Sequence, residues 1–380
     1  MLKKRLLLYR WHIAAFLLFL IPTAIGISQG CFTNKENIEN RELSSFPKIT
    51  CSADLTKFPA KFETYYVDHL PMKDTLVASL SKLHYTVYRE SFTEQVIIGD
   101  DGWLFYNKAE DGDPIADYKG TNLYTEEEMA YLAGCLEDAR IFLEEQGTQF
   151  LFVLAPGKEK IYGQEHLPSY YKEGEVTRSA QFLAYLNEHY PQIQCLDLQP
   201  TLSECAQSGS YDLYYKTDTH WNQLGAYIGS QEVLKKTGRL PAEEKTQPEE
   251  STLLFHSENL GDLAGLLGLK KDTFFSETDV TISTDSYASY VTEFQDYNLV
   301  SHYYGEATDD VKLILNGDSF STYMIPYLAG YYSEMYRFKR DQYKKPVGMW
   351  EAVENMHPDW FVYETTDRYL SQISTLELTR

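Results

Sequence analysis

Two short stretches of this 380-residue chain carry residue types that could transfer an acyl group. Asp218 and His220 stand two residues apart in the stretch YDLYYKTDTHWNQL, and Ser319 lies in the stretch KLILNGDSFSTY. A serine hydroxyl is a poor nucleophile unless a base takes its proton, and a histidine held by a carboxylate suits that task. The three residues therefore predict a triad in which Ser319 attacks, His220 takes and returns the proton, and Asp218 holds the imidazole.

The element expected to position Ser319 is a corner between a buried strand and a helix. The apolar run 313–315 predicts the strand, Gly317 is expected to end it by adopting backbone angles closed to other residues, and 320–325 reads as the first turns of a helix. A hydroxyl at this corner would lie near free backbone N–H groups, where an oxyanion could be stabilised. The simpler alternative is that Ser319 or Asp318 only caps the helix.

Other roles stay open for the residues around His220. An Asp-x-His pair also occurs in metal sites, but a two-metal enzyme needs further clustered ligands, and no clustered histidine motif follows here. His220 could also be a structural histidine in a turn. Trp221 and Asn222 are candidates for substrate binding, with Trp221 expected to form core or pocket wall in preference to touching substrate. No metal or organic cofactor is implied.

The wider pattern alternates strands and helices. After a predicted hairpin at 96–106, a capping box at Thr125 opens a helix to about residue 146. Further strands are predicted at 150–154, 193–198, 313–315, 335–338 and 359–363, with helices at about 179–190, 225–236 and 320–331. Repeated β-α-β alternation predicts an α/β fold, a three-layer sandwich with a mostly parallel central sheet.

Lys158 and Tyr162 follow the strand predicted at 150–154, at the carboxyl end where open α/β sheets bind ligands. Both are therefore candidate substrate-binding residues. The alternative for Lys158 is an ordinary solvated loop lysine.

The N-terminus predicts a membrane anchor. Residues 11–28 contain no charge if His12 is neutral, and four basic residues precede them. Such a run crosses most of a bilayer and, by the positive-inside rule, leaves the rest of the chain outside the cytoplasm. A cleaved signal peptide is the alternative. Residues 1–28 are thus predicted as cytoplasmic tip and anchor, 29–60 as an extended stalk, and 61–380 as the catalytic domain, with an insertion at about 239–311.

Charge and cysteine usage exclude several partners and sites. The formal net charge is −22, and residues 1–28 carry four bases and no acids, so the remainder carries −22 − 4 = −26. This charge argues against nucleic acid as a partner. Five cysteines are too few and too irregularly spaced for a disulfide framework or a zinc site. Cys195 and Cys205 could close a small disulfide loop, or both could be free.

Together the two motifs, LNGDSFS and TDTHWN, resemble the SGNH-hydrolase-like group that includes the alginate O-acetyltransferase proteins and the bacterial DHHW proteins. Supporting stretches are ENR at 39–41, GDDGWLFY at 99–106 and APGK at 155–158, so the resemblance covers most of residues 39–370. It implies a permuted SGNH-like fold in which Asp218, His220 and Ser319 form the triad. This chain has DTHW where DHHW proteins carry a second histidine, and the Gly and Asn blocks that complete the usual oxyanion hole are not matched.

The resemblance implies an anchored, outward-facing enzyme that moves an acyl group, most simply acetyl, on hydroxyls of a cell-surface polysaccharide. It also implies a membrane-bound acyltransferase partner that supplies acyl groups. Tyr323 and Arg368 are further candidates for substrate binding, and the 31 tyrosines suit a sugar-binding cleft. Two alternatives stay open: an esterase that uses water as acceptor, and a non-catalytic polysaccharide-binding scaffold of an export complex.

Overall fold

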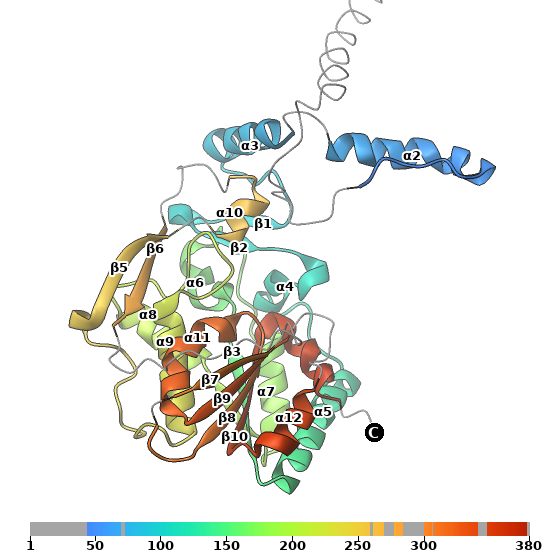
Figure 1. The fold of residues 1–380 in the computed structure, drawn as a ribbon. Coiled ribbons are helices and arrows are strands. Elements are labelled where there is room, and N and C mark those ends of the chain that lie inside the picture. The colour runs from blue at the N-terminus through green and yellow to red at the C-terminus, as the bar shows by residue number, and fades with distance from the viewer. Residues whose placement is uncertain are drawn as a thin grey trace, which may run out of the picture. The chain divides into compact units, whose positions relative to one another are not determined.

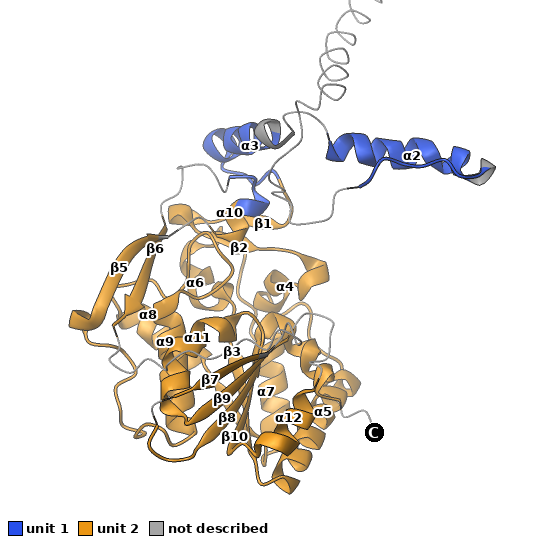
Figure 2. Ribbon diagram, in the orientation of Figure 1, with its two compact units in different colours: residues 1–92, 265–269 blue, residues 93–264, 270–380 orange. Residues whose placement is uncertain are grey.

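The computed structural model describes residues 44–69, 73–258, 261–269, 277–283, 300–305, 307–340 and 348–377. It contains two compact units, residues 1–92 with 265–269 and residues 93–264 with 270–380 (Figure 2). The first unit includes the helices α2 (Ser52–Asp68) and α3 (Lys73–Leu83), and a π-helical turn at His84–Tyr88 follows α3. The predicted anchor at 11–28 lies outside the described residues. Within the described ranges, no helix has both the length and the apolar character that crossing a bilayer requires.

The second unit is built on a six-stranded sheet with strand order β4-β3-β10-β8-β9-β7 (Figure 1). These strands are β3 (Gln149–Ala155), β4 (Gln194–Asp197), β7 (Val300–Tyr304), β8 (Lys312–Gly317), β9 (Glu334–Lys339) and β10 (Trp360–Thr366). Every neighbouring pair is parallel except β7 with β9. The predicted α/β fold with a mostly parallel sheet is confirmed. The last strand of the sequence, β10, lies in the middle of the sheet between β3 and β8.

Helices cover both faces of this sheet. One face carries α6 (Lys158–His166), α8 (Gln199–Ser208), α9 (Gln223–Lys236) and α11 (Phe320–Leu328), and the other carries α5 (Glu126–Glu145), α7 (Arg178–His189), α12 (Met349–Met356) and the 3₁₀ segment Asp367–Leu376. Strand side chains alternate between the two cores: Leu151 and Val153 pack toward α9 and α11, whereas Phe150 and Phe152 pack toward α5 and α7. This alternation gives the three-layer sandwich that the sequence predicts.

Shorter elements complete the second unit. A hairpin of β1 (Val96–Ile98) and β2 (Leu104–Tyr106) forms as predicted, and Thr125 caps α5 through a capping box with Glu128. A separate antiparallel pair consists of β5 (Leu253–Glu258) and β6 (Glu277–Ile282). The remaining short helices are α4 (Pro114–Tyr118), α10 (Asp262–Leu266), whose residues from 265 on belong to the first unit, and 3₁₀ turns at Asp100–Gly102, Ala109–Asp111, Glu250–Thr252 and Ala329–Tyr331.

The structure corrects two predicted boundaries. The extended stalk predicted for 29–60 ends earlier, because α2 begins at Ser52 and continues through Pro59. The Asp54 carboxylate closes its first turn by accepting the N–H groups of Thr50 and Cys51. The predicted insertion at 239–311 is also too long, because β7 pairs with β9 as the antiparallel edge of the main sheet. Cys195 and Cys205 are both free thiols.

A buried ion cluster supports the carboxyl ends of β3 and β10. Lys160 Nζ lies 2.7 Å from Asp117 Oδ2 and 3.1 Å from Asp367 Oδ2, and all three side chains are buried. Asp367 also accepts the backbone N–H of Gly157, directly after β3. The cluster therefore ties α6 to the loops at the carboxyl ends of β3 and β10.

Replacing Lys160 with alanine is expected to lower the free energy of unfolding by about 3–5 kcal/mol, because two buried carboxylates lose their cation. Urea denaturation of the two proteins measures this difference. Lys172→Ala, at an exposed lysine, is the matched control, with an expected change within about 0.5 kcal/mol. A Lys160→Ala protein as stable as the wild type would contradict the importance of the cluster.

Candidate active site

Ser319 stands at the corner where β8 ends and α11 begins. It occupies the N-cap position of α11, but its side chain makes no capping hydrogen bond. Asp318 takes that role, because its Oδ1 accepts the backbone N–H of Phe320 at 2.9 Å. The capping alternative therefore applies to Asp318, and the hydroxyl of Ser319 is left for another partner.

Gly317 is required at this corner for a different reason from the one predicted. Its φ is not among the positive values of the chain, so special backbone angles are not needed. A Cβ at this position would instead lie 2.5 Å from the Cβ of Ser321 and 2.6 Å from Glu364 Oε2. Glycine thus allows the strand end to approach α11 and β10 closely.

The loop between α8 and α9 places the other two predicted triad residues against Ser319. The ring nitrogen Nδ1 of His220 lies 2.6 Å from Asp218 Oδ1, and Nε2 lies 2.7 Å from the hydroxyl oxygen of Ser319. The carboxylate also accepts the backbone N–H of His220 at 3.0 Å. Donation from Nδ1–H to Asp218 leaves Nε2 as an acceptor for the serine proton. The structure thus brings the three predicted residues together, although His220 and Ser319 are 99 residues apart in the sequence.

The surroundings of the three side chains suit proton transfer. Ser319 is partly exposed, and the side chains of His220 and Asp218 keep 17% and 18% of their exposure, so a substrate can reach them. Burial acts to raise the pKa of Asp218, but the hydrogen bond and charge of His220 outweigh it and lower this pKa. Asp218 therefore stays ionised and can stabilise the imidazolium that forms when His220 takes a proton.

Lys158 and Tyr162 do not face substrate, contrary to the prediction. Lys158 is 3% exposed, and its ammonium donates to the carbonyl oxygens of Tyr215, Lys216 and Asp218 at 3.0, 3.1 and 2.7 Å. These three bonds use all the N–H groups of a lysine. Burial lowers the pKa of Lys158 to about 8. Lys158 is therefore neither a substrate ligand nor a solvated loop lysine, but the support of the catalytic loop.

Three further side chains also belong to the support of this loop. The buried Tyr162 accepts the N–H of Leu213 through its hydroxyl at 2.9 Å. Trp221 is completely buried and donates from its indole N–H to the carbonyl of Phe320 at 3.2 Å. Asn222 caps α9 by accepting the N–H of Gly225. The predicted substrate contacts of Tyr162 and Asn222 are therefore wrong, because each side chain is enclosed by the fold, and Trp221 forms core, which was the preferred expectation for it.

Arg368 and Tyr323, the other two predicted substrate residues, border the site. Arg368 lines a hollow with Thr219 and Phe320, and its guanidinium lies over the rings of Tyr106 and Tyr369 at 5.4 and 4.7 Å. Its Nε is buried and meets no hydrogen-bond acceptor among the described residues. The partly exposed ring of Tyr323 lies 5.6 Å from the ring of His220. Both side chains are placed where a bound substrate could contact them.

Two groups near Ser319 that could serve an oxyanion are already engaged. The N–H of Phe320 is held by Asp318. The buried guanidinium of Arg337 donates to the carbonyl of Asp318 and to the hydroxyls of Ser321 and Thr322. Arg337 therefore holds the corner in shape and does not face the reacting atoms.

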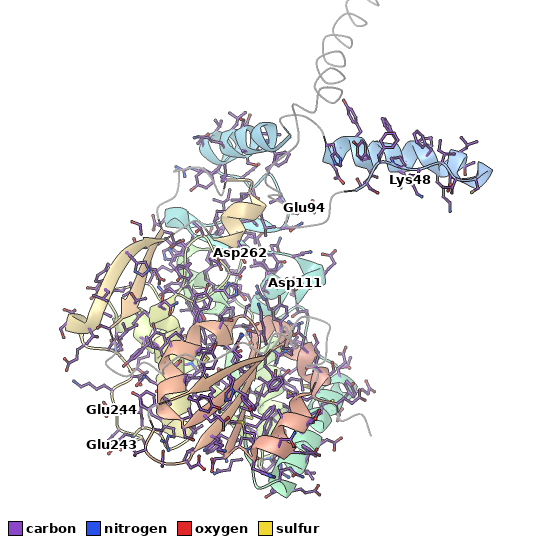
Figure 3. The ribbon with its side chains drawn as sticks, viewed as in Figure 1. Lys48, Glu94, Asp111, Glu243, Glu244 and Asp262 are labelled. Carbon is purple, nitrogen blue, oxygen red and sulfur yellow. The ribbon has the colours of Figure 1, made fainter. Side chains whose placement is uncertain are left out.

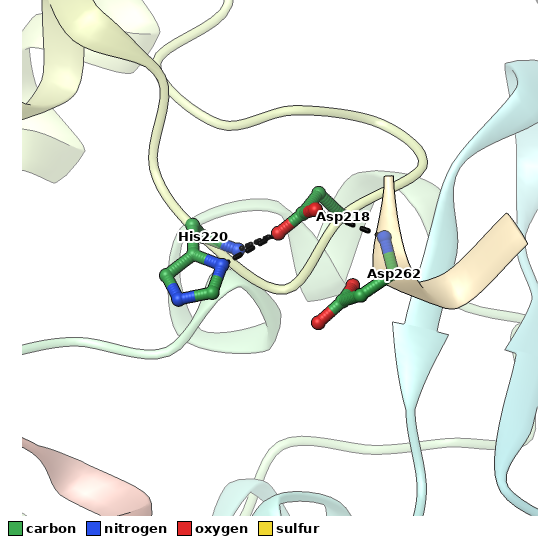
Figure 4. Close-up of side chains that lie close together, drawn as sticks. All are labelled: Asp218, His220 and Asp262. Carbon is green, nitrogen blue, oxygen red and sulfur yellow. Dashed lines mark hydrogen bonds and ion pairs between the residues drawn. The ribbon is translucent and has the colours of Figure 1, made fainter. Parts of the chain in front are cut away.

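Asp262 was not predicted as a site residue, because it lies in the predicted insertion at 239–311, which contains no recognised motif. Its backbone N–H donates to Asp218 Oδ2 at 2.9 Å (Figure 4). Asp218, His220 and Asp262 each offer a ligand atom within 4.8 Å of the others, the arrangement of a small metal site. A metal there would compete with Ser319 or Asp218 for the nitrogens of His220, so the same imidazole cannot fill both roles at once.

Comparison with models of protein families shows to which family the chain belongs. A family model described as "SGNH hydrolase-like domain, acetyltransferase AlgX" matches residues 96–334, which is more than half of the sequence. The chain belongs to this family. The family resemblance predicted from the two motifs is thereby confirmed, and the matched range contains the whole Asp218-His220-Ser319 arrangement of this AlgX-type protein.

Individual relatives agree with the family match. The AlgX-type chain is 29% identical over 203 residues to a "Probable alginate O-acetylase AlgJ" of Pseudomonas fluorescens, which covers 51% of this chain and 47% of the relative. It is 25% identical over 200 residues to the protein of the same name in Pseudomonas syringae pv. tomato, covering 50% and 46%. The chain thus spans about half the length of the curated relatives it matches.

Solved structures share the fold. Bacillus cereus PatB1 with a sulfonyl adduct aligns over 77% of this chain and 99% of its own, with a TM-score of 0.53 and 17% identity. A DHHW family protein of Eubacterium siraeum aligns over 73% and 97%, with a TM-score of 0.50 and 16% identity. At these identities the likeness extends to the fold alone.

Proposed function

We propose that this AlgX-type protein is a serine-dependent O-acyltransferase that moves an acetyl group to or from hydroxyls of a cell-surface or exported polysaccharide. The observation that supports it most directly is the continuous chain of contacts from Asp218 Oδ1 to His220 Nδ1, 2.6 Å, and from His220 Nε2 to Ser319 Oγ, 2.7 Å. The family match and the relatives named as probable alginate O-acetylases support acetyl as the group and a polysaccharide as the acceptor.

The proposed reaction has two steps. Ser319 Oγ attacks the acyl carbonyl while its proton passes to His220 Nε2, and the leaving oxygen then takes that proton from His220. A sugar hydroxyl next gives its proton to His220 and attacks the acyl-serine ester; His220 then passes this proton to Ser319 Oγ as the ester bond breaks, which releases Ser319 and the acetylated sugar. Asp218 remains ionised throughout and holds the ring. Arg368 and Tyr323 border the space in which the acyl donor or the sugar would lie.

We propose further that the enzyme works outside the cytoplasm, anchored by residues 11–28, and receives acyl groups through a membrane-bound acyltransferase partner. The apolar run behind four basic residues supports the location. An esterase is the second candidate function, because the same triad serves a water acceptor when water is not excluded. The partial exposure of the triad is the observation that favours it.

The test uses the purified full chain with a chromogenic acetyl ester and a sulfonyl fluoride. We expect release of the chromophore, and we expect the sulfonyl fluoride to stop it by labelling Ser319, identified by mass spectrometry of the peptide. Adding a polysaccharide should yield acetylated sugar in an acyltransferase, whereas an esterase yields only acetate. A chelator such as EDTA should leave the rate unchanged, because the proposed mechanism needs His220 free of metal.

Three results would overturn parts of the proposal. A protein that neither releases the chromophore nor reacts with the sulfonyl fluoride would leave the binding-scaffold alternative. Labelling at another serine would remove Ser319 from the mechanism. Loss of activity with EDTA, restored by added metal, would favour the metal arrangement of Asp218, His220 and Asp262 over the triad.

A further inference from the structure

The catalytic loop is held by a turn that is distant in sequence. Residues 261–264 and Glu277 contact the loop at 216–220, and the backbone N–H groups of Leu263 and Ala264 donate to the carbonyl of Thr217. Glu277, which is 6% exposed, accepts the N–H groups of Lys216 and Thr217. Lys158 therefore holds the carbonyl groups of Tyr215, Lys216 and Asp218, whereas the turn holds the carbonyl of Thr217 and Glu277 holds two amide groups.

Asp262 contacts Asp218, the carboxylate that holds His220 (Figure 4). Its backbone N–H donates to Asp218 Oδ2 at 2.9 Å, so both carboxylate oxygens of Asp218 are occupied, Oδ1 by His220 and Oδ2 by Asp262. Its side chain accepts twice from Thr219: the N–H at 2.9 Å and the hydroxyl at 2.7 Å. The side chain of Asp262 thus holds Thr219, which lies between Asp218 and His220. Its backbone N–H fixes the orientation of the Asp218 carboxylate.

The neighbouring glycine shows how closely this turn is fitted to Asp218. A Cβ at Gly261 would lie 2.3 Å from the Cβ of Asp218 and 2.6 Å from its Oδ2. The N–H of Gly261 donates to Thr217 Oγ1 at 3.0 Å, and this hydrogen bond keeps Gly261 close to Asp218. Any side chain here would displace either Asp218 or the turn itself.

Two roles for Asp262 must be separated. As a charge, it would act by its proximity to Asp218 and His220, whether on the imidazolium or on a metal ion. As a hydrogen-bonding group, it would act only through Thr219. An asparagine distinguishes the two, because its Oδ1 can accept the Thr219 N–H while its Nδ2 donates to the Thr219 hydroxyl, which accepts as readily as it donates.

We propose that Asp262 is a positioning residue: through its two hydrogen bonds to Thr219 and its backbone contact to Asp218, it holds the Asp218-His220 pair in the geometry that reaches Ser319. The effect of Asp262 on the reaction rate rests on the proposed function. Its effect on the positions of Asp218 and His220 does not. A displacement of about 1 Å in catalytic geometry can cost on the order of a hundredfold in rate. The role requires the hydrogen bonds and not the charge.

The test compares Asp262→Ala with Asp262→Asn in the full chain. We expect Asp262→Ala to lower kcat roughly ten- to hundredfold with KM nearly unchanged, and to slow sulfonyl fluoride labelling of Ser319 by the same factor. Asp262→Asn should restore most of the loss. Thr219→Val should give part of this loss, because it removes the hydroxyl hydrogen bond and keeps the backbone one, and the double variant should lose little more than Asp262→Ala.

Matched controls use positions away from this turn. Glu243→Gln removes an exposed carboxylate from the loop before β5 (Figure 3), and no change is expected. For the glycine, Gly261→Ala should reduce kcat, whereas Gly134→Ala in α5, where a Cβ meets nothing within 4 Å, should not.

A spectroscopic reading is independent of activity. The short hydrogen bond between Nδ1–H of His220 and Asp218 should give a low-field proton resonance in the wild type and in Asp262→Asn, and Asp262→Ala should shift or broaden it. An unchanged resonance and rate in Asp262→Ala would overturn the proposal, as would equal losses in both variants, which would assign the role to charge. An active Ser319→Ala protein would overturn the proposed function instead, and the resonance would then decide the role of Asp262.

Discussion

Replacing Ser319 with alanine is expected to lower kcat for acetyl release by at least about 10⁴-fold, because the nucleophile of the proposed mechanism is removed and no acyl-serine can form. The fold should survive this change. Ser319 is partly exposed, its side chain makes no cap for α11, and Asp318 supplies that cap. Initial rates with a chromogenic ester, together with the thermal midpoint of unfolding, measure both expectations.

Ser169→Ala is the matched control for this loss, because Ser169 is exposed and lies 49 residues (218 − 169) from Asp218, the triad residue nearest to it in the sequence. His220→Ala should reduce kcat to a similar level, and the Ser319-His220 double variant should lose little more, because the two residues act as a unit. A Ser319→Ala protein that keeps the rate of the wild type would exclude the serine mechanism.

Replacing Lys158 with methionine is expected to give the second large effect, a loss of roughly a hundredfold in kcat. Methionine fills a similar space but donates no hydrogen bond, so the carbonyl groups of Tyr215, Lys216 and Asp218 would converge without a donor. The loop would then move, and His220 with it. Rates measured with protein shown to be folded by circular dichroism test this expectation.

The same lysine predicts a pH dependence. Burial lowers the pKa of Lys158 to about 8, so below that pH it is an ammonium with a donor for each carbonyl, and above it one carbonyl faces a lone pair. Activity of the wild type should therefore decrease as the pH rises through about 8. The Lys158→Met protein should lack this decrease, and Lys119→Met, at an exposed lysine, should retain it. An identical alkaline profile in Lys158→Met would assign the decrease to another group.

The sequence was sufficient where a local pattern determines the structure. The apolar run before Gly317 predicted β8, and the residues that could relay a proton were recognised from their types, because serine-histidine-aspartate chemistry permits few alternatives. The alternation of strands and helices predicted the mostly parallel sheet. Each of these inferences uses residues close together in the chain or a reaction that defines its own participants.

The features of the site that the sequence did not predict depend on contacts between segments that are distant in the chain. Lys158 follows a strand, as a ligand-binding lysine would, and only the folded loop at 215–218 reveals that three carbonyl groups surround it. Asp262 is 44 residues from Asp218, in a segment without clear periodicity, so no spacing could connect them. The enclosure of Trp221 likewise depends on Phe320 in α11.

The central place of β10 in the sheet has a consequence for biosynthesis. While the ribosome still holds residues 360–366, β3 and β8 have no strand between them, and the two hydrophobic cores cannot close. The corner with the nucleophilic serine is therefore completed only after residues 360–366 have emerged. A nascent chain of this protein is expected to remain inactive until β10 has left the ribosome and paired with β3 and β8.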